Sequence, residues 1–269
     1  MSILKQGHNY EPMPHDGKTI RRIYRGGRCY YHDSPYSLAA TQALKAAFPQ
    51  YWKAIRDYGW ANPALVPFIN EDPMLIVSLV EVGKTRWLVG DGDAGIITNI
   101  LDFDAVDADV LFTALPTAGV FGYNYNNNGT QRRKSFGFNG RGYPTFGIGD
   151  GGSAYIQKQD GWSLNYEYHI RAEFGTTCTL YQNGVKLYEG SATRSNQIEC
   201  GIMCINTAVG TQNIKGRGKG FEVYLQGETI AKFLPYNNGT ECGMLDIVSL
   251  TFYPNANTQG SFTIELTDK

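Results

Sequence analysis

Four Asn-Gly pairs punctuate the chain after residue 120, and they constrain its fold more than any other feature. They stand at residues 128–129, 139–140, 183–184 and 238–239. Asn-Gly is the strongest short-range hairpin signal, because a type I′ turn needs positive φ at both central residues. In "TCTLYQNGVKLYEG" the pair separates two β-prone runs, Thr177 to Tyr181 and Val185 to Tyr188. Many short antiparallel strands at this spacing predict a sandwich or a barrel.

The composition agrees with a mainly β chain and excludes some partners. Its 269 residues include 32 glycines, 13% aromatic and only 18% charged residues, and 24 Lys and Arg balance 25 Asp and Glu. Such balance creates no global field toward nucleic acid or an anionic membrane. The N-terminus lacks signal-peptide features, and no apolar run is long enough to span a bilayer. We therefore expect no nucleic-acid partner, no membrane insertion and synthesis in a reducing cytoplasm.

The stretch "KTIRRIYRGGRCYYHD" predicts a short, locally basic hairpin that reverses at Gly26-Gly27. One interpretation is a solvated hairpin face. The other is docking onto an acidic protein surface or nucleic acid. On the docking interpretation, the candidate assembly residues are Arg21, Arg22 and Arg25.

Two short helices are predicted next, over Pro35–Ala47 and Pro49–Tyr58. Ser34 is the expected N-cap of the first helix, and Gly59 is expected to end the second. Helical spacing places an aromatic stripe on one face, which we expect to pack on the hairpin or on a neighbouring domain. Its candidate assembly anchors are Phe48 and Trp52.

The apolar run Met74–Val82 is predicted to be a strand that follows a proline-rich connector. From about Thr85 onward the chain consists of short β-prone runs. The expected organisation is therefore an attachment region over residues 1–84, with a hairpin and helices, and a β domain over residues 85–269.

The motif "GDGDAG", residues 90–95, has three possible interpretations. A phosphate loop would need a helix after it, but "IITNILDF" is β-prone. An EF-hand would need a distal glutamate that is absent, although lectin-type calcium sites gather ligands from distant loops. We favour a structural interpretation, in which the glycines allow a bend that starts the first sandwich strand and the aspartates are solvated. No metal and no cofactor are therefore expected, and the five cysteines lack the spacing of a metal site.

Catalytic constellations are missing from the sequence. A glycosidase on this fold would need two carboxylates close together on one strand, whereas Glu167 and Glu173 are six residues apart. No Gly-x-Ser-x-Gly nucleophile elbow is present. The aspartates of "LDFDAVDADV" are expected on the polar side of a strand and its turn, with metal binding as the alternative. We therefore expect no enzymatic activity.

Binding is the remaining chemistry, and residues 122–147 carry its clearest signal. "GYNYNNNGTQRRKSFGFNGRGYPTFG" combines rings, amides and guanidinium groups, which stack on sugars and bond to hydroxyls. An aromatic hairpin packed against the sandwich is the alternative. The candidate ligand-binding residues are Tyr123, Tyr125, Asn126, Arg141 and Tyr143.

Four segments resemble, in the same order, one known family. They are "LVGDGDAGIITNI", "FGYNYNNN…FGFNGRG", "LYQNGVKLYEG" and the closing "GFEVYLQGETIAKFLPYNNGTECGMLDIVSLTFYPNANTQGSF". The family comprises the concanavalin A-like (laminin-G-like) jelly-roll domains of structural and tail proteins in phages and prophages of gut bacteria. The resemblance runs from about Arg86 to the C-terminus. The chain departs from it at Thr98, where many relatives have aspartate.

The resemblance implies an antiparallel jelly-roll β-sandwich from about Arg86 onward. Together with the hairpin and helices predicted above, the expected fold is mainly β, a jelly-roll β-sandwich with a small N-terminal hairpin and helical region. The resemblance also implies a phage virion component, an appendage whose lectin-like jelly-roll binds a host-surface glycan or another subunit. The partners would be other virion proteins and further copies of this chain. The alternatives are a bacterial carbohydrate-binding module and a glycoside hydrolase.

Overall fold

A computed structural model describes residues 34–115, 119–127, 130–150, 152–155, 162–191, 199–207 and 210–269, together with four short strands before residue 32. For these four strands, and for residues 125–127, 130–132, 149–150, 152–155 and 210, only the backbone is described. The chain divides into two compact units, Met1–Met74 and Leu75–Lys269. The expected boundary at residue 84 lies later in the chain.

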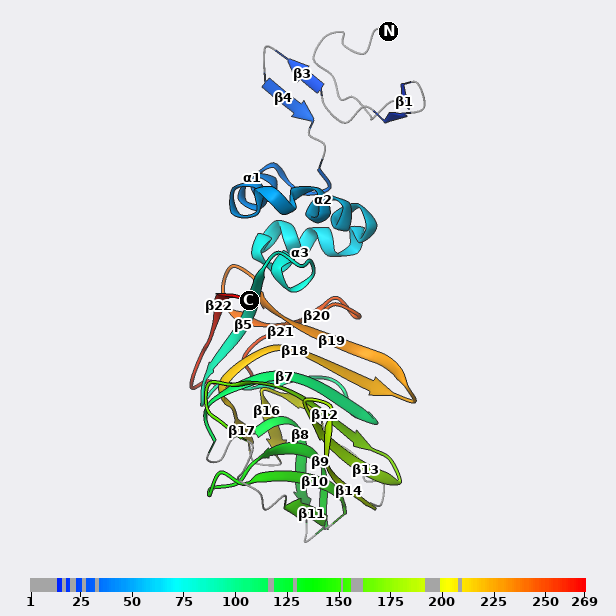
Figure 1. Ribbon diagram of the computed structural model, residues 1–269, viewed down its shortest axis with the longest axis vertical. Helices are drawn as coiled ribbons and strands as arrows, with labels where there is room; N and C mark the ends of the chain where they lie inside the picture. The colour runs from blue at the N-terminus through cyan, green and yellow to red at the C-terminus, as the bar shows by residue number, and fades with distance from the viewer. Residues whose placement is uncertain are drawn as a thin grey trace. The chain divides into compact units, whose positions relative to one another are not determined.

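Short strands and helices make up the first unit (Figure 1). They are β1 (Pro14–His15), β2 (Lys18–Thr19), β3 (Ile23–Arg25), β4 (Arg28–Tyr31), α1 (Leu38–Ala47), α2 (Trp52–Ala61) and α3 (Val66–Glu71), with 3-10 helices at Pro49–Tyr51 and Pro63–Leu65. Strands β3 and β4 pair antiparallel, with Arg25 opposite Arg28. This pairing confirms the predicted hairpin.

Helix α1 begins three residues later than predicted, and its N-cap is Ser37. The Ser37 hydroxyl accepts a hydrogen bond from the Ala40 N–H at 3.2 Å. Ser34, the expected cap, instead accepts from the Thr41 hydroxyl at 2.8 Å. The intervening residue explains the difference, because Tyr36 is buried and its hydroxyl donates to the Ile55 carbonyl at 2.6 Å. Packing of Tyr36 against α2 therefore keeps residues 35–37 out of the helix.

Gly59 lies inside α2 and does not end it, since the helix continues to Ala61. A Cβ atom built at Gly59 would collide with the Tyr36 ring and would lie 2.5 Å from Cγ of Pro35. The glycine thus serves close packing of the preceding segment on α2 rather than helix termination.

The predicted strand Met74–Val82 is also wrong. Its first half is a 3-10 helix, Pro73–Ser78, in which Leu75 and Ile76 are fully buried. A short apolar run fits a buried strand and a buried helix equally well. Pro73 at the first helical position decides between them, because its fixed φ suits a helix start.

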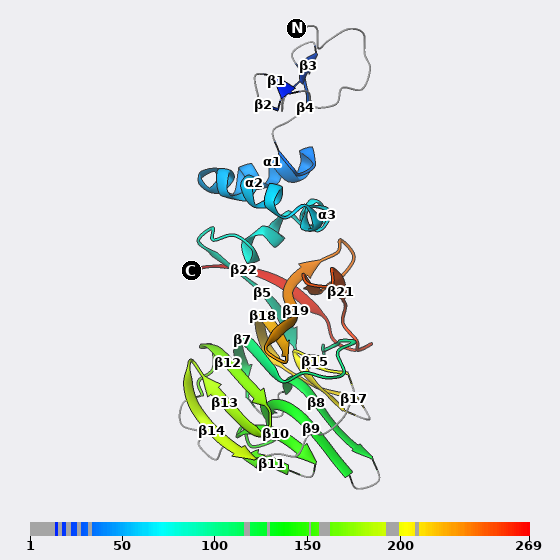
Figure 2. The same cartoon turned by 90° about the vertical axis from the view of Figure 1, so that its right-hand side faces the viewer.

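The second unit is built from two sheets whose strands pair mainly antiparallel (Figure 1, Figure 2). The ten-stranded sheet contains β5 (Lys84–Asp91), β7 (Ala105–Ala114), β12 (Glu167–Phe174), β13 (Thr177–Gln182), β14 (Val185–Ser191), β18 (Lys215–Leu225), β19 (Glu228–Asn237), β20 (Cys242–Asp246), β21 (Thr251–Tyr253) and β22 (Phe262–Asp268). The eight-stranded sheet contains β6 (Ile96–Ile97), β8 (Gly119–Asn127), β9 (Thr130–Phe138), β10 (Pro144–Asp150), β11 (Gly152–Tyr155), β15 (Gly201–Ile202), β16 (Cys204–Thr207) and β17 (Gly210–Asn213).

Strand order shows that distant segments meet in both sheets. The large sheet runs β14-β13-β12-β7-β18-β19-β20-β21, and β5 joins β18 to β22. The small sheet runs β11-β10-β9-β8-β15-β6, with β16 on β8 and β17 on β16. One pair in it, β16 with β8, is parallel. This is the antiparallel jelly-roll β-sandwich that the sequence predicts.

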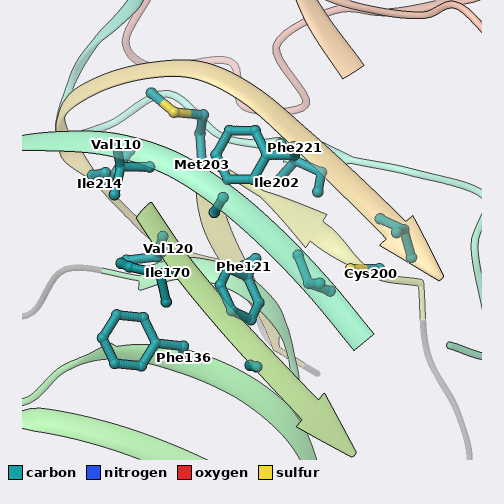
Figure 3. Packing of buried hydrophobic residues seen from close by; sticks show 14 of the residues in the cluster. Val110, Val120, Phe121, Phe136, Ile170, Cys200, Ile202, Met203, Ile214 and Phe221 are labelled. Atoms are coloured by element: carbon teal, nitrogen blue, oxygen red, sulfur yellow. The ribbon is translucent and has the colours of Figure 1, made fainter. Parts of the chain in front are cut away.

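One core lies between the two sheets. Along β7, Val106, Ala108, Val110 and Phe112 are buried while the residues between them face outward. This alternation is typical of a strand with one covered face. Rings and aliphatic side chains of the small sheet, Phe121 and Phe136 among them, pack against this inner face (Figure 3).

"GDGDAG" ends a strand rather than starting one. Strand β5 runs up to Asp91, and the two-residue β6 follows only at Ile96. Between them Gly92 has φ of +105°, which a side chain would strain. The bend that the glycines were expected to allow is therefore present, but at the far end of β5.

The clearest predicted hairpin is confirmed. Strands β13 and β14 pair antiparallel, and Asn183 and Gly184 between them have φ of 49° and 78°. A second tight turn, which the sequence reading missed, joins β18 to β19 with φ of 54° at Gln226 and 84° at Gly227. The pair Asn128-Gly129 lies outside the described residues.

Truncation tests where the second unit begins. We expect residues 75–269 to unfold in one cooperative transition, because they hold a complete core. A chain of residues 85–269 loses Leu75 and Ile76, both fully buried, and we expect it to be less stable by about 2–5 kcal/mol. Urea denaturation followed by circular dichroism measures both. Equal stability of the two fragments would place the boundary at residue 84.

Candidate functional site

Tyr123, a predicted ligand-binding residue, is a core residue. Its side chain is 1% exposed, and its ring stands edge-on to Phe103 at 6.0 Å. The register of β8 with β9 shifts between Gly119 and Phe121, and beyond this shift both Phe121 and Tyr123 are buried. A buried ring cannot stack on a sugar, so the prediction for Tyr123 is wrong.

Of the other four predicted ligand-binding residues, two lie in a described loop and two have side chains that lie outside the described residues. Arg141 is exposed and Tyr143 half-buried in the loop between β9 and β10. Asn139 Oδ1 holds this loop by accepting from the backbone N–H groups of Arg141 at 2.9 Å and Tyr143 at 3.1 Å. The side chains of Tyr125 and Asn126 lie outside the described residues. For these four residues, sugar binding stays a prediction.

The predicted assembly residues differ in exposure. Phe48 is only 4% exposed, so its ring is unavailable as an anchor for another molecule. Trp52 is half-buried, with Tyr36 edge-on at 6.5 Å and Lys45 Nζ over its ring at 4.7 Å. Arg21, Arg22 and the side chain of Arg25 lie outside the described residues. Assembly through the arginines and Trp52 stays a prediction.

A shallow hollow at the start of β12 and the β13–β14 turn has the chemistry expected of a sugar site. Its volume is about 360 Å³, and its lining is Ser163, Tyr166, Tyr168, Gln182, Asn183 and Val185. Tyr166 is 55% exposed, whereas Tyr168 is buried and lies 5.0 Å from it between ring centroids. The exposed ring of Tyr166 thus packs against the buried ring of Tyr168.

Polar groups around this hollow are held in place by the backbone. Asn183 is exposed, and its Oδ1 accepts from the His169 N–H at 2.8 Å. This bond fixes the amide plane. The Tyr168 hydroxyl accepts from the Ser163 N–H at 2.5 Å. We name these six lining residues the Tyr166 hollow.

The sequence reading missed the Tyr166 hollow because strand alternation misleads at this position. Tyr166 and Tyr168 are two residues apart, a spacing that predicts the same buried face. Strand β12 starts only at Glu167, and Asn165 before it has φ of 59°. This turn takes Tyr166 out of the strand and leaves its ring exposed. A polar residue that tolerates positive φ, followed at once by tyrosine, was the available signal.

The outer face of the large sheet is charged and ordered by ion pairs. Asp107 on β7 bonds Arg171 on β12 at 2.8 Å, and Asp109 lies 3.0 Å from His169 Nδ1. Burial alone would lower the pKa of Arg171, but Glu173 and Asp107 raise it. The expected polar side of a strand is confirmed for Asp107 and Asp109.

Glu222 and Tyr224 extend the same charged face on β18. The Tyr224 hydroxyl donates to Glu222 Oε2 at 2.7 Å, and Lys232 pairs with the same carboxylate. Burial would raise the pKa of Glu222, yet Lys232 and Tyr224 hold it below its ordinary value. Burial and the neighbouring carboxylates raise the pKa of Tyr224. A carboxylate kept charged at neutral pH is suited to hydrogen bonding rather than to general acid catalysis.

Asp91, in "GDGDAG", closes the loop after β5. Its Oδ1 accepts from the N–H groups of Asp93 at 2.9 Å and Ala94 at 3.1 Å, and its Oδ2 accepts from that of Ser261 at 2.8 Å. Slight burial would raise the pKa of Asp91, but these N–H donors lower it below the ordinary 3.8. The expectation of merely solvated aspartates is thus incomplete for Asp91.

The Asp91 carboxylate predicts a pH dependence of stability. A lowered folded-state pKa contributes stability that is present above pH 3.8 and is lost as the pH falls through the lower value. We expect Asp91→Asn to cost about 1 kcal/mol at neutral pH, because an amide nitrogen cannot accept from Ser261. The cost should shrink below pH 3.8. Urea denaturation of both proteins at neutral and acid pH measures it, and a constant difference would contradict it.

Metal ligands and reactive thiols give no second site in the described part of the chain. Those residues contain no group of three or more His, Cys, Asp or Glu side chains placed to hold a metal ion. Cys178, Cys200, Cys204 and Cys242 are free thiols. Burial raises the pKa of Cys200 to about 12, which keeps its thiol protonated and unreactive. Among the described residues, no helix is long and apolar enough to cross a membrane.

Comparison with known proteins gives likenesses of fold. The sequence matches no protein-family profile and no curated protein. A presumptive carbohydrate-binding protein from Bacteroides ovatus matches in structure with a TM-score of 0.45 and 13% identity, over 71% of this chain and 61% of that one. Domains LG4-5 of the mouse laminin α1 chain match with a TM-score of 0.39 and 10% identity, over 65% of this chain and 47% of that one. A peptidase of the eqolisin family, SCP-B, matches with a TM-score of 0.24 and 13% identity, over 71% of this chain and all of that one.

The fold and the hollow together define a class. The second unit is a β-sandwich, an antiparallel jelly-roll with an exposed ring and amide at one end of its large sheet.

Proposed function

We propose that the second unit binds a neutral glycan at the Tyr166 hollow. The observation that carries the proposal is an exposed tyrosine ring, 55% accessible, in one shallow hollow with the exposed amide of Asn183. Aromatic faces stack on the C–H face of a sugar ring, and amides bond to its hydroxyls. This combination provides both parts of sugar recognition.

Preorganisation favours binding at this hollow. Tyr166 packs on the buried Tyr168, and the Asn183 amide is fixed by the His169 N–H. A ligand therefore pays little entropy to order the side chains that it meets. A shallow, open hollow also suits the end of a chain or a single exposed sugar unit of a polymer.

The lining of the hollow indicates a neutral sugar. All six side chains are uncharged at neutral pH. An acidic sugar would lose hydration of its carboxylate without gaining a cationic partner there. We expect the affinity for the bound glycan to change little between low and high salt.

Substitution of Tyr166 tests the site. On a glycan array, the full chain should bind neutral glycans, and Tyr166→Ala should weaken binding about tenfold, since a stacking contact contributes roughly 1 kcal/mol beyond its buried area. Tyr166→Phe should bind nearly as well as the unchanged protein, because it keeps the ring. Isothermal titration with the best array glycan measures the affinities.

A matched tyrosine variant provides the control. Tyr143→Ala removes a half-buried tyrosine from the loop that the sequence pointed to. Normal binding by Tyr143→Ala, combined with weak binding by Tyr166→Ala, supports the Tyr166 hollow. The reverse result would move the site to the loop between β9 and β10, and would restore Arg141 and Tyr143 as the ligand residues.

We further propose a setting for this binding, for which the support is the family resemblance alone. The chain would be a virion appendage that assembles with other virion proteins and further copies of itself through the first unit, and presents the jelly-roll to a host-surface glycan. Immunoelectron microscopy of particles and host cells tests the setting. Label on virions would support it, whereas label confined to a bacterial surface would favour the alternative, a bacterial carbohydrate-binding module.

A further inference from the structure

The large sheet forks at β18, and a hollow occupies the fork. On one side β18 pairs with β7 along its length. On the other side its first residues, Lys215 to Gly218, pair with β5, whereas Phe221 to Leu225 pair with β19. Lys219 falls between the two partner strands, where the register with β7 shifts. The divergence of β5 and β19 opens the outer face at this point.

The fork hollow has a volume of about 350 Å³. This is at the low end of the range of small-molecule sites. Its walls come from the segment before β5, from β5, β7, β12, β18 and β19, and from the C-terminal Lys269. Its polar lining includes Ser78, Asp107, His169, Lys219 and Lys232.

Two oxygen atoms in this wall are buried without a hydrogen-bond partner among the described residues. They are the hydroxyl oxygen of Ser78 and Oδ1 of Asp107. The other oxygen of Asp107 bonds Arg171 at 2.8 Å, and His169 Nε2 is too far from Oδ1, at 3.8 Å, for a hydrogen bond. An unsatisfied buried oxygen is costly, and native proteins normally supply a partner for it. The partner for Asp107 must be a hydrogen-bond donor.

The charged residues that line the fork hollow restrict the net charge of a ligand that could donate to Asp107. Each of the hollow's four lysines already has a carboxylate partner; the pairs are Lys84–Asp268, Lys219–Glu167, Lys232–Glu222 and Lys269–Glu81. An anionic ligand would meet Asp107 and find the four lysines engaged, and the remaining cation of the wall, Arg86, is only 3% exposed. A cationic ligand would meet lysines on several sides. A neutral group that donates to a carboxylate and accepts from an ammonium or hydroxyl group avoids both conflicts.

We propose that the fork hollow binds a neutral, hydroxyl-rich molecule, namely a sugar unit, through Asp107 and Ser78. A hydroxyl group donates one hydrogen bond and accepts others. One sugar hydroxyl donates to Oδ1 of Asp107, and the next exchanges a hydrogen bond with Ser78. The neighbouring lysines donate to the ring and hydroxyl oxygens. This site is distinct from the Tyr166 hollow, since the two share no lining residue.

One residue connects the two sites. The His169 N–H holds the Asn183 amide of the Tyr166 hollow, and the His169 side chain belongs to the wall of the fork hollow. The protein would then contact a glycan by ring stacking at one site and by hydroxyl recognition at the other. Each site can be tested without the other.

Nuclear magnetic resonance of the isotope-labelled full chain tests the proposal. The probes are glucose, galactose, mannose and N-acetylglucosamine, titrated singly. We expect at least one of them to shift the backbone amide signals of Ser78, Asp107 and Lys219. Asp107→Asn and Ser78→Ala should each weaken that binding about tenfold, since each removes a hydrogen bond to the sugar. If Asp107→Asn fails to fold because it weakens the ion pair with Arg171, Ser78→Ala still tests the site, since it keeps that pair.

Two controls separate this site from other effects. Glu173→Gln changes a carboxylate on the same sheet face that bonds Arg171 but does not line the hollow, and it should leave the shifts unchanged. Tyr166→Ala should remove only the shifts around Tyr166 and Asn183. Shifts confined to the Tyr166 hollow would overturn this inference and leave the proposed function standing. Fork shifts produced by phosphate or glycine betaine in place of the sugars would also overturn it.

Discussion

Phe112→Ala should lower the free energy of unfolding by about 3–5 kcal/mol, the usual cost of removing a buried aromatic ring. Phe112 is fully buried on the inner face of β7. Its ring lies 4.9 Å from that of Phe138 and 6.0 Å from those of Trp162 and Tyr168. These rings come from both sheets, so the substitution leaves a cavity at the centre of the sandwich. Urea denaturation monitored by tryptophan fluorescence measures the change.

The neighbouring residue gives the control for Phe112. Leu111 is the next residue on β7 and faces outward, half-buried. Leu111→Ala should cost clearly less than Phe112→Ala. Similar costs for the two variants would mean that the register of β7 in the sandwich is wrong.

Gly122→Ala should be nearly as damaging, by roughly 3 kcal/mol or more, for a different reason. Gly122 has φ of +97°, and a Cβ atom there would overlap the carbonyl oxygen of Lys134 and lie 2.7 Å from Cα of Ser135. Both contacts are backbone atoms of β9, which cannot move without breaking the pairing of β8 with β9. Thermal unfolding of the purified variant measures the loss.

Gly184 is the matched control for Gly122. Its φ is +78°, and a Cβ atom there meets nothing within 4 Å. Gly184→Ala should therefore lower the free energy of unfolding only by the conformational cost of positive φ, about 1 kcal/mol. If Gly122→Ala were as mild as Gly184→Ala, the close approach of β8 and β9 at this position would be disproved.

Local turn chemistry made part of the fold predictable. Asn183-Gly184 identified the β13–β14 hairpin, and Gly26-Gly27 identified the reversal between β3 and β4. At Asn183-Gly184 the two residues between the strands adopt the positive φ that this turn needs. The Gln226-Gly227 turn escaped prediction because glutamine seldom adopts positive φ.

Misplaced elements arose where tertiary packing overrides local sequence. Ser34 and Ser37 are equally good caps by type, and burial of Tyr36 selects Ser37. Met74–Val82 satisfies a strand pattern, but its first part forms a 3-10 helix. A local pattern carries no information on which neighbour covers an apolar run.

The candidate site was the least predictable part. Tyr123 lies beyond a shift in the β8 register and is buried, and the turn at Asn165 leaves Tyr166 exposed. Neither event follows from composition, and each changes which tyrosine a ligand can reach. The fork hollow forms where β18 pairs with both β5 and β19. Since β5 is distant in sequence from the other two strands, no single segment of the sequence predicts the hollow.

The pairing of β5 with β22 sets how the second unit responds to force. The register places Lys84 opposite Asp268, and the Lys269 N–H donates to the Gly83 carbonyl at 3.3 Å, so the first strand of this unit starts where its last strand stops. A pull that separates these two ends loads the hydrogen bonds of β5 and β22 one after another, like a zipper, rather than all together in shear. The unit should therefore open at low force from this end. A pull between residue 84 and a ligand held at the Tyr166 hollow bypasses β22 and loads the pairing of β5 with β18.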